Sequence, residues 1–132
     1  MELAVTDTHP LVWFALGKPS RLSRNSRRWF NRVEGGRAAL FVPTMVLAEM
    51  GDMARRGEIR LPGGLSLWAD RLFATHRFFP SDLTFAVVSR AETLYEIRDR
   101  SDRLIAATAA ELDLPLITRD AAIAEAGVAT IW

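Results

Sequence analysis

The chain has 132 residues, 49% of them hydrophobic, which is enough for one ordinary core, and we expect residues 1–132 to form a single domain. It contains no cysteine, which excludes disulfides, thiolate zinc sites, iron–sulfur clusters and cysteine nucleophiles. Seventeen basic and sixteen acidic side chains give a net charge of +1, so any contact with nucleic acid must come from a local patch. No apolar run is long enough to span a membrane and no secretory signal precedes the first strand, which predicts a cytoplasmic protein with no membrane contact.

The first half of the chain alternates short apolar segments with helical patterns. Strands are predicted over residues 3–6 and 38–42, and helices over 11–16, 23–34 and 45–56. Asp7 ends the first strand, and Pro10 is expected to open the helix after it. In the helix over 45–56, Glu49 shares a face with the apolar residues Val46 and Met50.

The second half repeats the alternation less clearly. Helices are predicted over residues 65–75, from a cap at Ser81 or Asp82 through Leu94, and from Asp102 to Leu112; strands are predicted over 78–79, 114–118 and near 130–131. Alternating helices and strands that are apolar throughout are typical of parallel sheets covered on both faces. The sequence therefore predicts an α/β fold with three layers, α/β/α, around a central, mainly parallel sheet.

Four acidic residues are the candidate functional groups: Asp7, Glu49, Asp102 and Asp120. In open parallel sheets the ligand site lies beyond the carboxyl ends of the strands, and Asp7 and Asp120 stand at such ends. Glu49 and Asp102 are expected to reach the same edge from helices. Because carboxylates are rarely buried unless they are paired or bound to a metal, this set favours a divalent cation and phosphate chemistry.

Each acid also has a simpler interpretation. Aspartate is a favoured helix cap, so Asp102 and Asp120, each taken singly, are explained as caps. Glu49 lies one turn inside its predicted helix, too far from the helix start to act as a cap. Asp99 is a candidate supporting acid in the loop before Asp102. Phosphoaspartyl enzymes are disfavoured, because no second acid follows Asp7 at the second position and the only lysine of the chain comes early.

Arginines at three- and four-residue spacing form a basic stripe on the second predicted helix: Arg21, Arg24, Arg28 and Arg32. Such a stripe is a candidate contact for the RNA backbone. It is also typical of the solvated side of a helix, and the spacing does not separate the two interpretations.

Several motifs together resemble the PIN-domain ribonucleases, in particular VapC-type toxins. They are Val5–Trp13 at the first acid, Val46–Glu49 at the second, Asp99–Ala107 at the third and Leu114–Asp120 at the fourth. The motifs occur in the family's order over nearly the whole chain, although residues 58–92 carry little of the resemblance.

The resemblance implies an Mg²⁺- or Mn²⁺-dependent endoribonuclease, the toxin of a type II toxin–antitoxin pair. Asp7 and Asp102 would be metal ligands, Glu49 would orient a water on the ion, Asp120 would hold a second or weaker ion, and Thr118 would support water or phosphate nearby. Partners implied by the family are the RNA substrate, a small antitoxin whose C-terminal segment crosses the toxin, and a second copy of the chain in a homodimer. Two alternatives stay open: a PIN-type nuclease of RNA processing or a DNA-directed relative, and a catalytically silent protein-binding module.

Overall fold

A computed structural model describes all residues from Met1 to Trp132 and contains one sheet of five strands in the order β3-β2-β1-β4-β5. The strands are β1 (Glu2–Thr6), β2 (Ala38–Pro43), β3 (Phe78–Ser81), β4 (Leu116–Ile117) and β5 (Thr130–Ile131). Every neighbouring pair is parallel. The prediction of an α/β fold is confirmed, and the sheet is parallel throughout.

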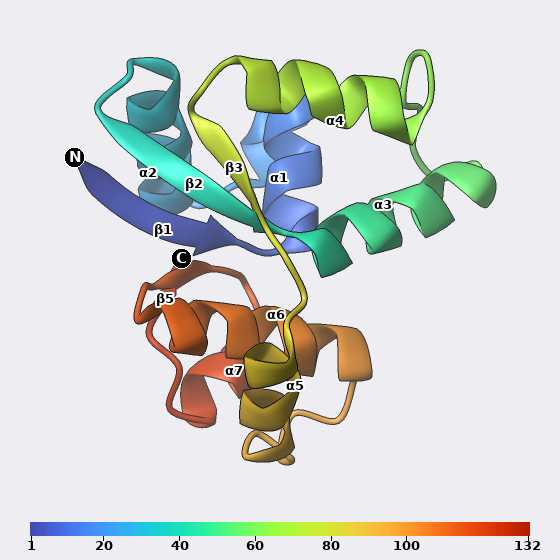
Figure 1. Cartoon of the computed structure of the whole chain (residues 1–132). Helices are drawn as coiled ribbons and strands as arrows, with labels where there is room; N and C mark the ends of the chain where they lie inside the picture. The colour runs from blue at the N-terminus through green and yellow to red at the C-terminus, as the bar shows by residue number, and fades with distance from the viewer.

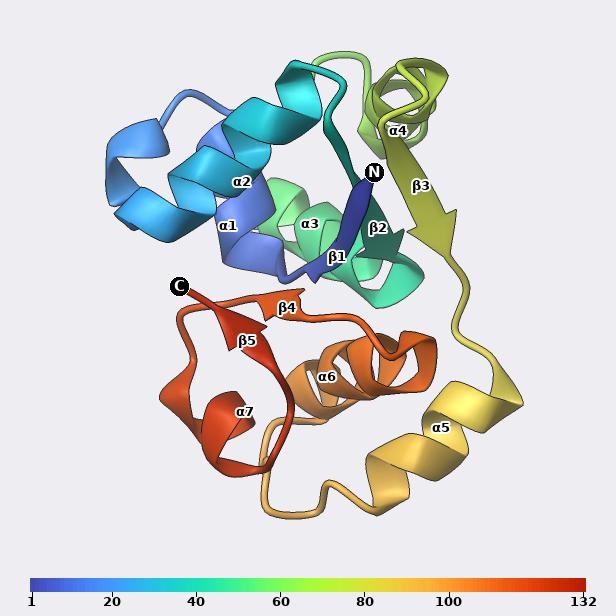
Figure 2. The same ribbon diagram turned by 90° about the vertical axis from the view of Figure 1, so that its left-hand side faces the viewer.

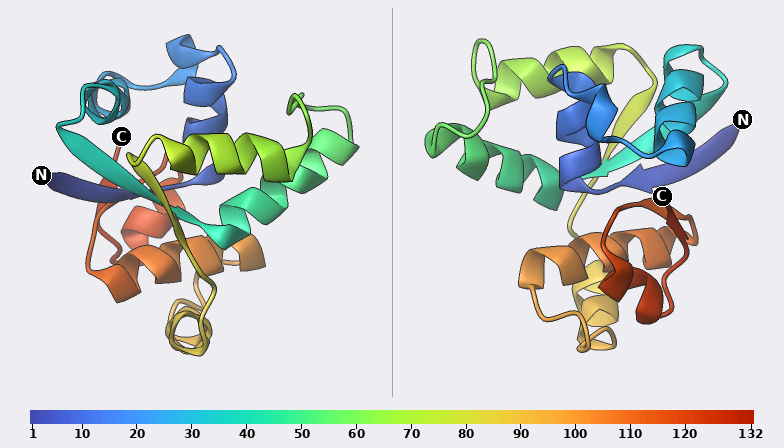
Figure 3. Two further views of the ribbon diagram at one scale, coloured as in Figure 1. Left: turned by 45° about the horizontal axis from the view of Figure 1, so that its top comes forward. Right: turned by 180° about the vertical axis from the view of Figure 1, so that it is seen from behind.

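The helices lie on both sides of this sheet (Figures 1 and 2). They are α1 (Thr8–Ala15), α2 (Arg24–Glu34), α3 (Thr44–Arg55), α4 (Leu65–Ala74), α5 (Phe85–Glu92), α6 (Arg100–Leu112) and α7 (Ala121–Glu125), with a short 3₁₀ helix, η1 (Pro19–Arg21). Helices α1, α2 and α4 cover one face, and α5, α6 and α7 lie beyond the other, while α3 runs outward from the end of β2 (Figure 3). The arrangement is the predicted three-layer architecture. None of these helices combines the length and the apolar character that crossing a membrane requires.

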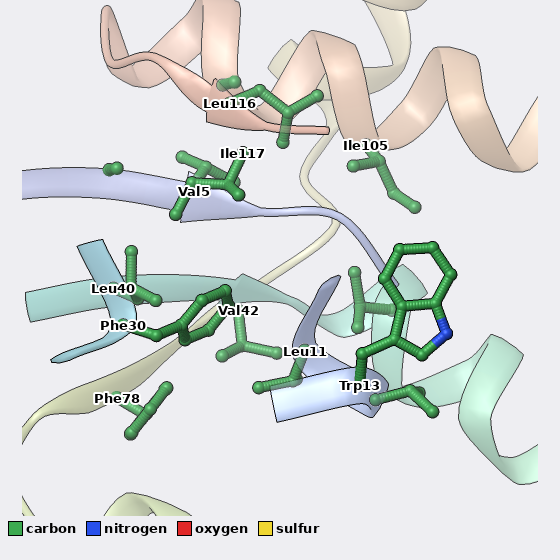
Figure 4. Close-up of a cluster of buried hydrophobic side chains, with 14 of the residues drawn as sticks. Val5, Leu11, Trp13, Phe30, Leu40, Val42, Phe78, Ile105, Leu116 and Ile117 are labelled. Carbon is green, nitrogen blue, oxygen red and sulfur yellow. The ribbon is translucent and has the colours of Figure 1, made fainter. Parts of the chain in front are cut away.

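The core explains why the central strands are apolar throughout. Side chains from the strands, among them Val5, Leu40 and Ile117, are fully buried between the two helical layers (Figure 4). On one side Phe30 of α2 stacks on Phe14 of α1, with 4.5 Å between the ring centroids. The carboxyl ends of β1 and β4 lie next to each other, because the two strands are directly paired.

The structure corrects several predicted element ends. Helix α5 begins at Phe85 and is capped by Thr84, whose hydroxyl accepts a hydrogen bond from Val87 N at 3.2 Å, so the predicted caps Ser81 and Asp82 are wrong. Ser81 instead pairs in β3, which runs two residues further than predicted. The strand predicted over 114–118 is reduced to two residues, and helix α7 was not predicted at all.

Candidate active site

Three aspartates line one hollow of about 290 Å³ at the carboxyl edge of the sheet: Asp7, Asp102 and Asp120. Asp7 directly follows β1, and Asp120 follows β4, the strand paired with β1. Asp102 enters from the first turn of α6. Residues far apart in the sequence therefore meet where the parallel sheet predicted a ligand site.

Asp7 is the most buried of these acids, with 9% of its surface exposed. Its Oδ1 accepts a hydrogen bond from Thr8 N at 2.8 Å, and its Oδ2 accepts one from the Thr118 hydroxyl at 2.7 Å. Burial raises the pKa of the Asp7 carboxyl, and these two hydrogen bonds oppose that rise because they stabilise the charged form. Each oxygen still has lone pairs free for a further contact.

Asp102 is the acid that the protein itself satisfies least. Its backbone N donates to Asp99 Oδ1 at 2.9 Å, but neither of its own carboxylate oxygens forms a hydrogen bond or an ion pair within the chain. Burial raises its pKa to about 7, and the negative charges of Asp7, Asp99, Asp120 and Glu49 add to the effect. The prediction that Asp102 begins its helix was wrong, because Asp99 is the cap and Asp102 is the third residue of α6.

Asp120 and Thr118 connect the strand end to the hollow. Asp120 caps α7, with Oδ1 accepting a hydrogen bond from Ala122 N at 2.9 Å, while its second oxygen has no partner within the chain. The Thr118 hydroxyl accepts a hydrogen bond from Asp120 N at 3.1 Å and donates one to Asp7. Thr118 therefore fixes both strand-end acids relative to each other.

Glu49 lies beside this hollow rather than in it. It lines an adjoining hollow of about 150 Å³, together with Thr8 and Ser101, and His9 lines both hollows. The Thr8 hydroxyl donates to Glu49 Oε1 at 2.5 Å. Burial raises the pKa of Glu49, with the charges of Asp7 and Asp99 acting in the same direction and the bond from Thr8 acting against them.

The donor set fits a hard divalent cation held in an open site. No three histidine, cysteine, aspartate or glutamate side chains stand close enough together to enclose an ion. Mg²⁺, however, is commonly held by one or two carboxylates, with waters and substrate phosphates completing its coordination. The unpartnered oxygens of Asp102 and Asp120, and the oxygen-only chemistry of the whole set, match that kind of site.

Two residues at the site were not among the predicted functional groups. Thr8 links Asp7 and Glu49 through its backbone N and its hydroxyl. Arg119 also lines the aspartate hollow, with its guanidinium 5.0 Å from the centre of the Trp13 ring. Both residues directly adjoin predicted acids in the sequence, and this adjacency was the only signal for them.

The predicted arginine stripe is divided between two surfaces. Arg24, Arg28 and Arg32 line one hollow on α2, as the helical spacing indicated. Arg21 belongs to η1 instead and lines a different hollow, which also contains Lys18. Because η1 ends at Arg21 and α2 begins at Arg24, the helical spacing does not continue through that segment.

Comparisons with known proteins find chains of similar fold. A chain of the VapBC2 complex of Rickettsia felis, solved with a DNA fragment from its promoter, has a TM-score of 0.70 at 15% identity, over 98% of this chain and 99% of its own. A chain of a toxin–antitoxin complex from Klebsiella pneumoniae has a TM-score of 0.57 at 19% identity, over 89% of this chain and 86% of its own. FitAcB from Neisseria gonorrhoeae has a TM-score of 0.56 at 21% identity, over 96% of this chain and 95% of its own.

Identities this low show a shared fold and no more. No curated protein matches the chain. The family model described as PIN domain matches residues 4–129, which is nearly the entire sequence. The chain therefore belongs to the PIN-domain family.

Proposed function

We propose that this protein is an Mg²⁺- or Mn²⁺-dependent endoribonuclease and the toxin of a type II toxin–antitoxin pair. The observation that carries the proposal is the Asp102 carboxylate, which lines a hollow with Asp7 and Asp120 and has no partner in the chain. Burial, together with the charges of the neighbouring acids, raises its pKa to about 7. Packing and capping do not account for a carboxylate placed in this way, whereas a divalent cation would offset its repulsion from Asp7 and Asp120.

In this proposal Asp7 and Asp102 hold the ion, and Asp120 holds a second or weaker one. When bound, such an ion polarises a phosphodiester and makes water a stronger nucleophile. Glu49 orients the attacking water from the adjoining hollow, and the Thr8 hydroxyl fixes the Glu49 carboxylate for that task. Arg119, held over Trp13, places a positive charge at the edge of the hollow where a substrate phosphate arrives.

An antitoxin partner is supported by a larger hollow of about 460 Å³ beside the acids. Its apolar lining includes Val12, Leu16 and Met53. Lys18, Arg21 and Arg60 add positive charge to the same hollow. A peptide with apolar side chains and acidic neighbours complements this surface, and the matched folds from toxin–antitoxin complexes favour such a partner.

A homodimer is the second proposed assembly. Apolar side chains are unusually exposed from the end of β3 into α5: Phe79, Leu83, Phe85 and Val88, with Phe85 85% exposed. Exposed apolar groups gathered in one segment favour a protein contact. We expect Phe85→Ser to shift the chain toward monomer in sedimentation experiments. Because the proposed substrate is RNA, we place the protein in the cytoplasm.

The decisive experiment is Mn²⁺ titration calorimetry on the wild type and on Asp102→Asn. Amide and carboxylate are nearly equal in size but differ in charge, so the variant should keep the fold and lose the ion. Binding by the wild type that is lost in the variant, followed by metal-dependent cleavage of RNA, supports the proposal. No binding by the wild type would contradict it and favour a silent binding module. Relief of growth inhibition by a neighbouring small reading frame separates a toxin from an RNA-processing nuclease.

A further inference from the structure

The surface of α2 contains a hollow of about 590 Å³ that is lined almost entirely by polar groups. We call it the arginine hollow; its lining residues are Leu22, Arg24, Arg27, Arg28, Asn31, Arg32 and Arg37. Five guanidinium groups thus meet around one depression in a chain whose net charge is only +1. This is the local basic patch that the overall charge requires of any nucleic-acid contact.

Most of this charge has no partner within the protein. Arg32 forms an ion pair with Glu2 at 2.7 Å, and Arg27 donates to the carbonyl of Pro19 at 3.0 Å. The side chains of Arg24, Arg28 and Arg37 form no hydrogen bond or ion pair within the chain. Several guanidinium groups side by side repel one another, and an anion with repeated negative charges offsets that repulsion while accepting paired hydrogen bonds.

The chemistry of the arginine hollow favours a polynucleotide over a protein partner. Leu22 is the only apolar residue in its lining, whereas protein interfaces normally have an apolar centre. Trp29, on the same helix and partly exposed, has the guanidinium of Arg32 at 5.5 Å from its ring centre. Aromatic rings among arginines are the usual surface for single strands, because bases stack while arginines bind phosphates.

We propose that the arginine hollow is a second binding site for single-stranded RNA, separate from the acids that would cut it. Arg32 pairs with Glu2 at the start of β1, while Asp7 follows the other end of that strand. Five residues of strand span about 16 Å, so the hollow extends toward the opposite edge of the sheet from the acids. Figure 1 shows α2 toward the beginning of β1 and α3 beyond its tip. A strand held at both places must therefore be several nucleotides long.

This inference rests on the proposed function only in taking RNA as the ligand, and its test needs no cleavage. The probe is a fluorescein-labelled, unstructured RNA of about 20 nucleotides, compared with one of about 4, in anisotropy titrations with a chelator present. The test protein is the double variant Arg24→Gln, Arg28→Gln. The matched control is Arg71→Gln, Arg90→Gln, which removes the same charge from exposed positions on α4 and α5.

The double variant should bind the long RNA about tenfold more weakly than the wild type, and the slope of log K against log salt should decrease by about 1.4, which is the value for two lost phosphate contacts. The short RNA carries fewer phosphates, so it should bind the wild type more weakly than the long RNA and lose less affinity in the double variant. An equal loss in the control pair, or a loss seen only with duplex DNA of the same length, would overturn the proposal. If the double variant binds the long RNA more weakly than a wild type that cleaves no RNA, that result would still support the arginine hollow and would count only against the proposed ribonuclease activity.

Discussion

The burial of Asp102, together with the negative charges around it, leads to a prediction about stability that can be tested without any substrate. Its pKa of about 7 lies well above the ordinary value of 3.8, which the unfolded chain would show. The folded state therefore binds the proton more tightly than the unfolded state. Above pH 7 the charged carboxylate destabilises the metal-free fold fully, and this destabilisation is relieved progressively as the pH falls from about 7 toward 3.8.

Replacing Asp102 by asparagine should remove that destabilisation. A rise in pKa from 3.8 to about 7 corresponds to roughly 4 kcal/mol in a fully buried setting, and solvent screening at this partly exposed residue reduces it to about 2 kcal/mol. Asparagine also loses the favourable interaction of a negative charge with the start of α6, about 0.3–1 kcal/mol. The free energy of unfolding at pH 8 should therefore increase by about 1 kcal/mol, which is a rise of about 4 °C in Tm.

The assay is thermal unfolding in the presence of a chelator at pH 8 and at pH 5. The gain from Asp102→Asn at pH 5 should be less than half of the gain at pH 8, since most of the carboxyl is then protonated in the folded protein. Asp70→Asn on the exposed side of α4 is the control and should change little at either pH. An equal effect of Asp102→Asn at both pH values, or a loss of stability at pH 8, would refute the electrostatic reasoning.

Three other predictions follow from the same contacts. Adding Mn²⁺ at about 100 times its dissociation constant should raise the free energy of unfolding of the wild type by about 2.7 kcal/mol at pH 8 and leave the Tm of Asp102→Asn unchanged. An equal rise in Tm for both proteins would mean that the ion binds elsewhere. Thr118→Val removes the hydroxyl that donates to Asp7 Oδ2, so it should lower the free energy of unfolding, measured in urea, by about 1–3 kcal/mol and weaken Mn²⁺ binding. Thr118→Ser keeps the hydroxyl and should behave like the wild type. Phe30→Ala should cost about 3–5 kcal/mol in the same urea assay, because the ring is fully buried and stacked on Phe14; a loss below 1 kcal/mol would mean that the core refills the space.

The fold was largely predictable because its signals are local. Strand β1 contains the apolar run Leu3–Val5 and β2 is apolar throughout, and the helices α2 and α3 have the spacing of amphipathic helices, so both patterns could be read directly. The errors fall where tertiary contacts decide. Ser81 is a good cap by residue type, but its pairing with Pro43 extends β3 and moves the helix start to Thr84.

The site was predictable in its members and less so in its geometry. Parallel pairing of β1 with β4 brings Asp7 and Asp120 together, and that pairing follows from fold logic. The sequence did not place Glu49 in a separate hollow or join it to Thr8 by a hydrogen bond, because that contact depends on how α3 lies against α1. The arginine hollow likewise includes Arg37, which lies after the helix and has no place in a helical repeat.

Capping and metal binding, which stood as rival explanations of the acids, act together in this structure. Asp7 and Asp120 do cap helices, and those hydrogen bonds fix their carboxylates at the hollow that both residues line while leaving lone pairs free. Asp102, which like Asp120 was explained by sequence as a cap, caps no helix: Asp99 caps α6 by accepting a hydrogen bond from Asp102 N. Two acids held rigidly by caps and one left without a partner form a site that is arranged before a cation arrives and is stabilised when it binds. The capped acids therefore supply fixed positions, and the uncapped one supplies a carboxylate whose charged form, disfavoured by burial and by the neighbouring charges, a cation would stabilise.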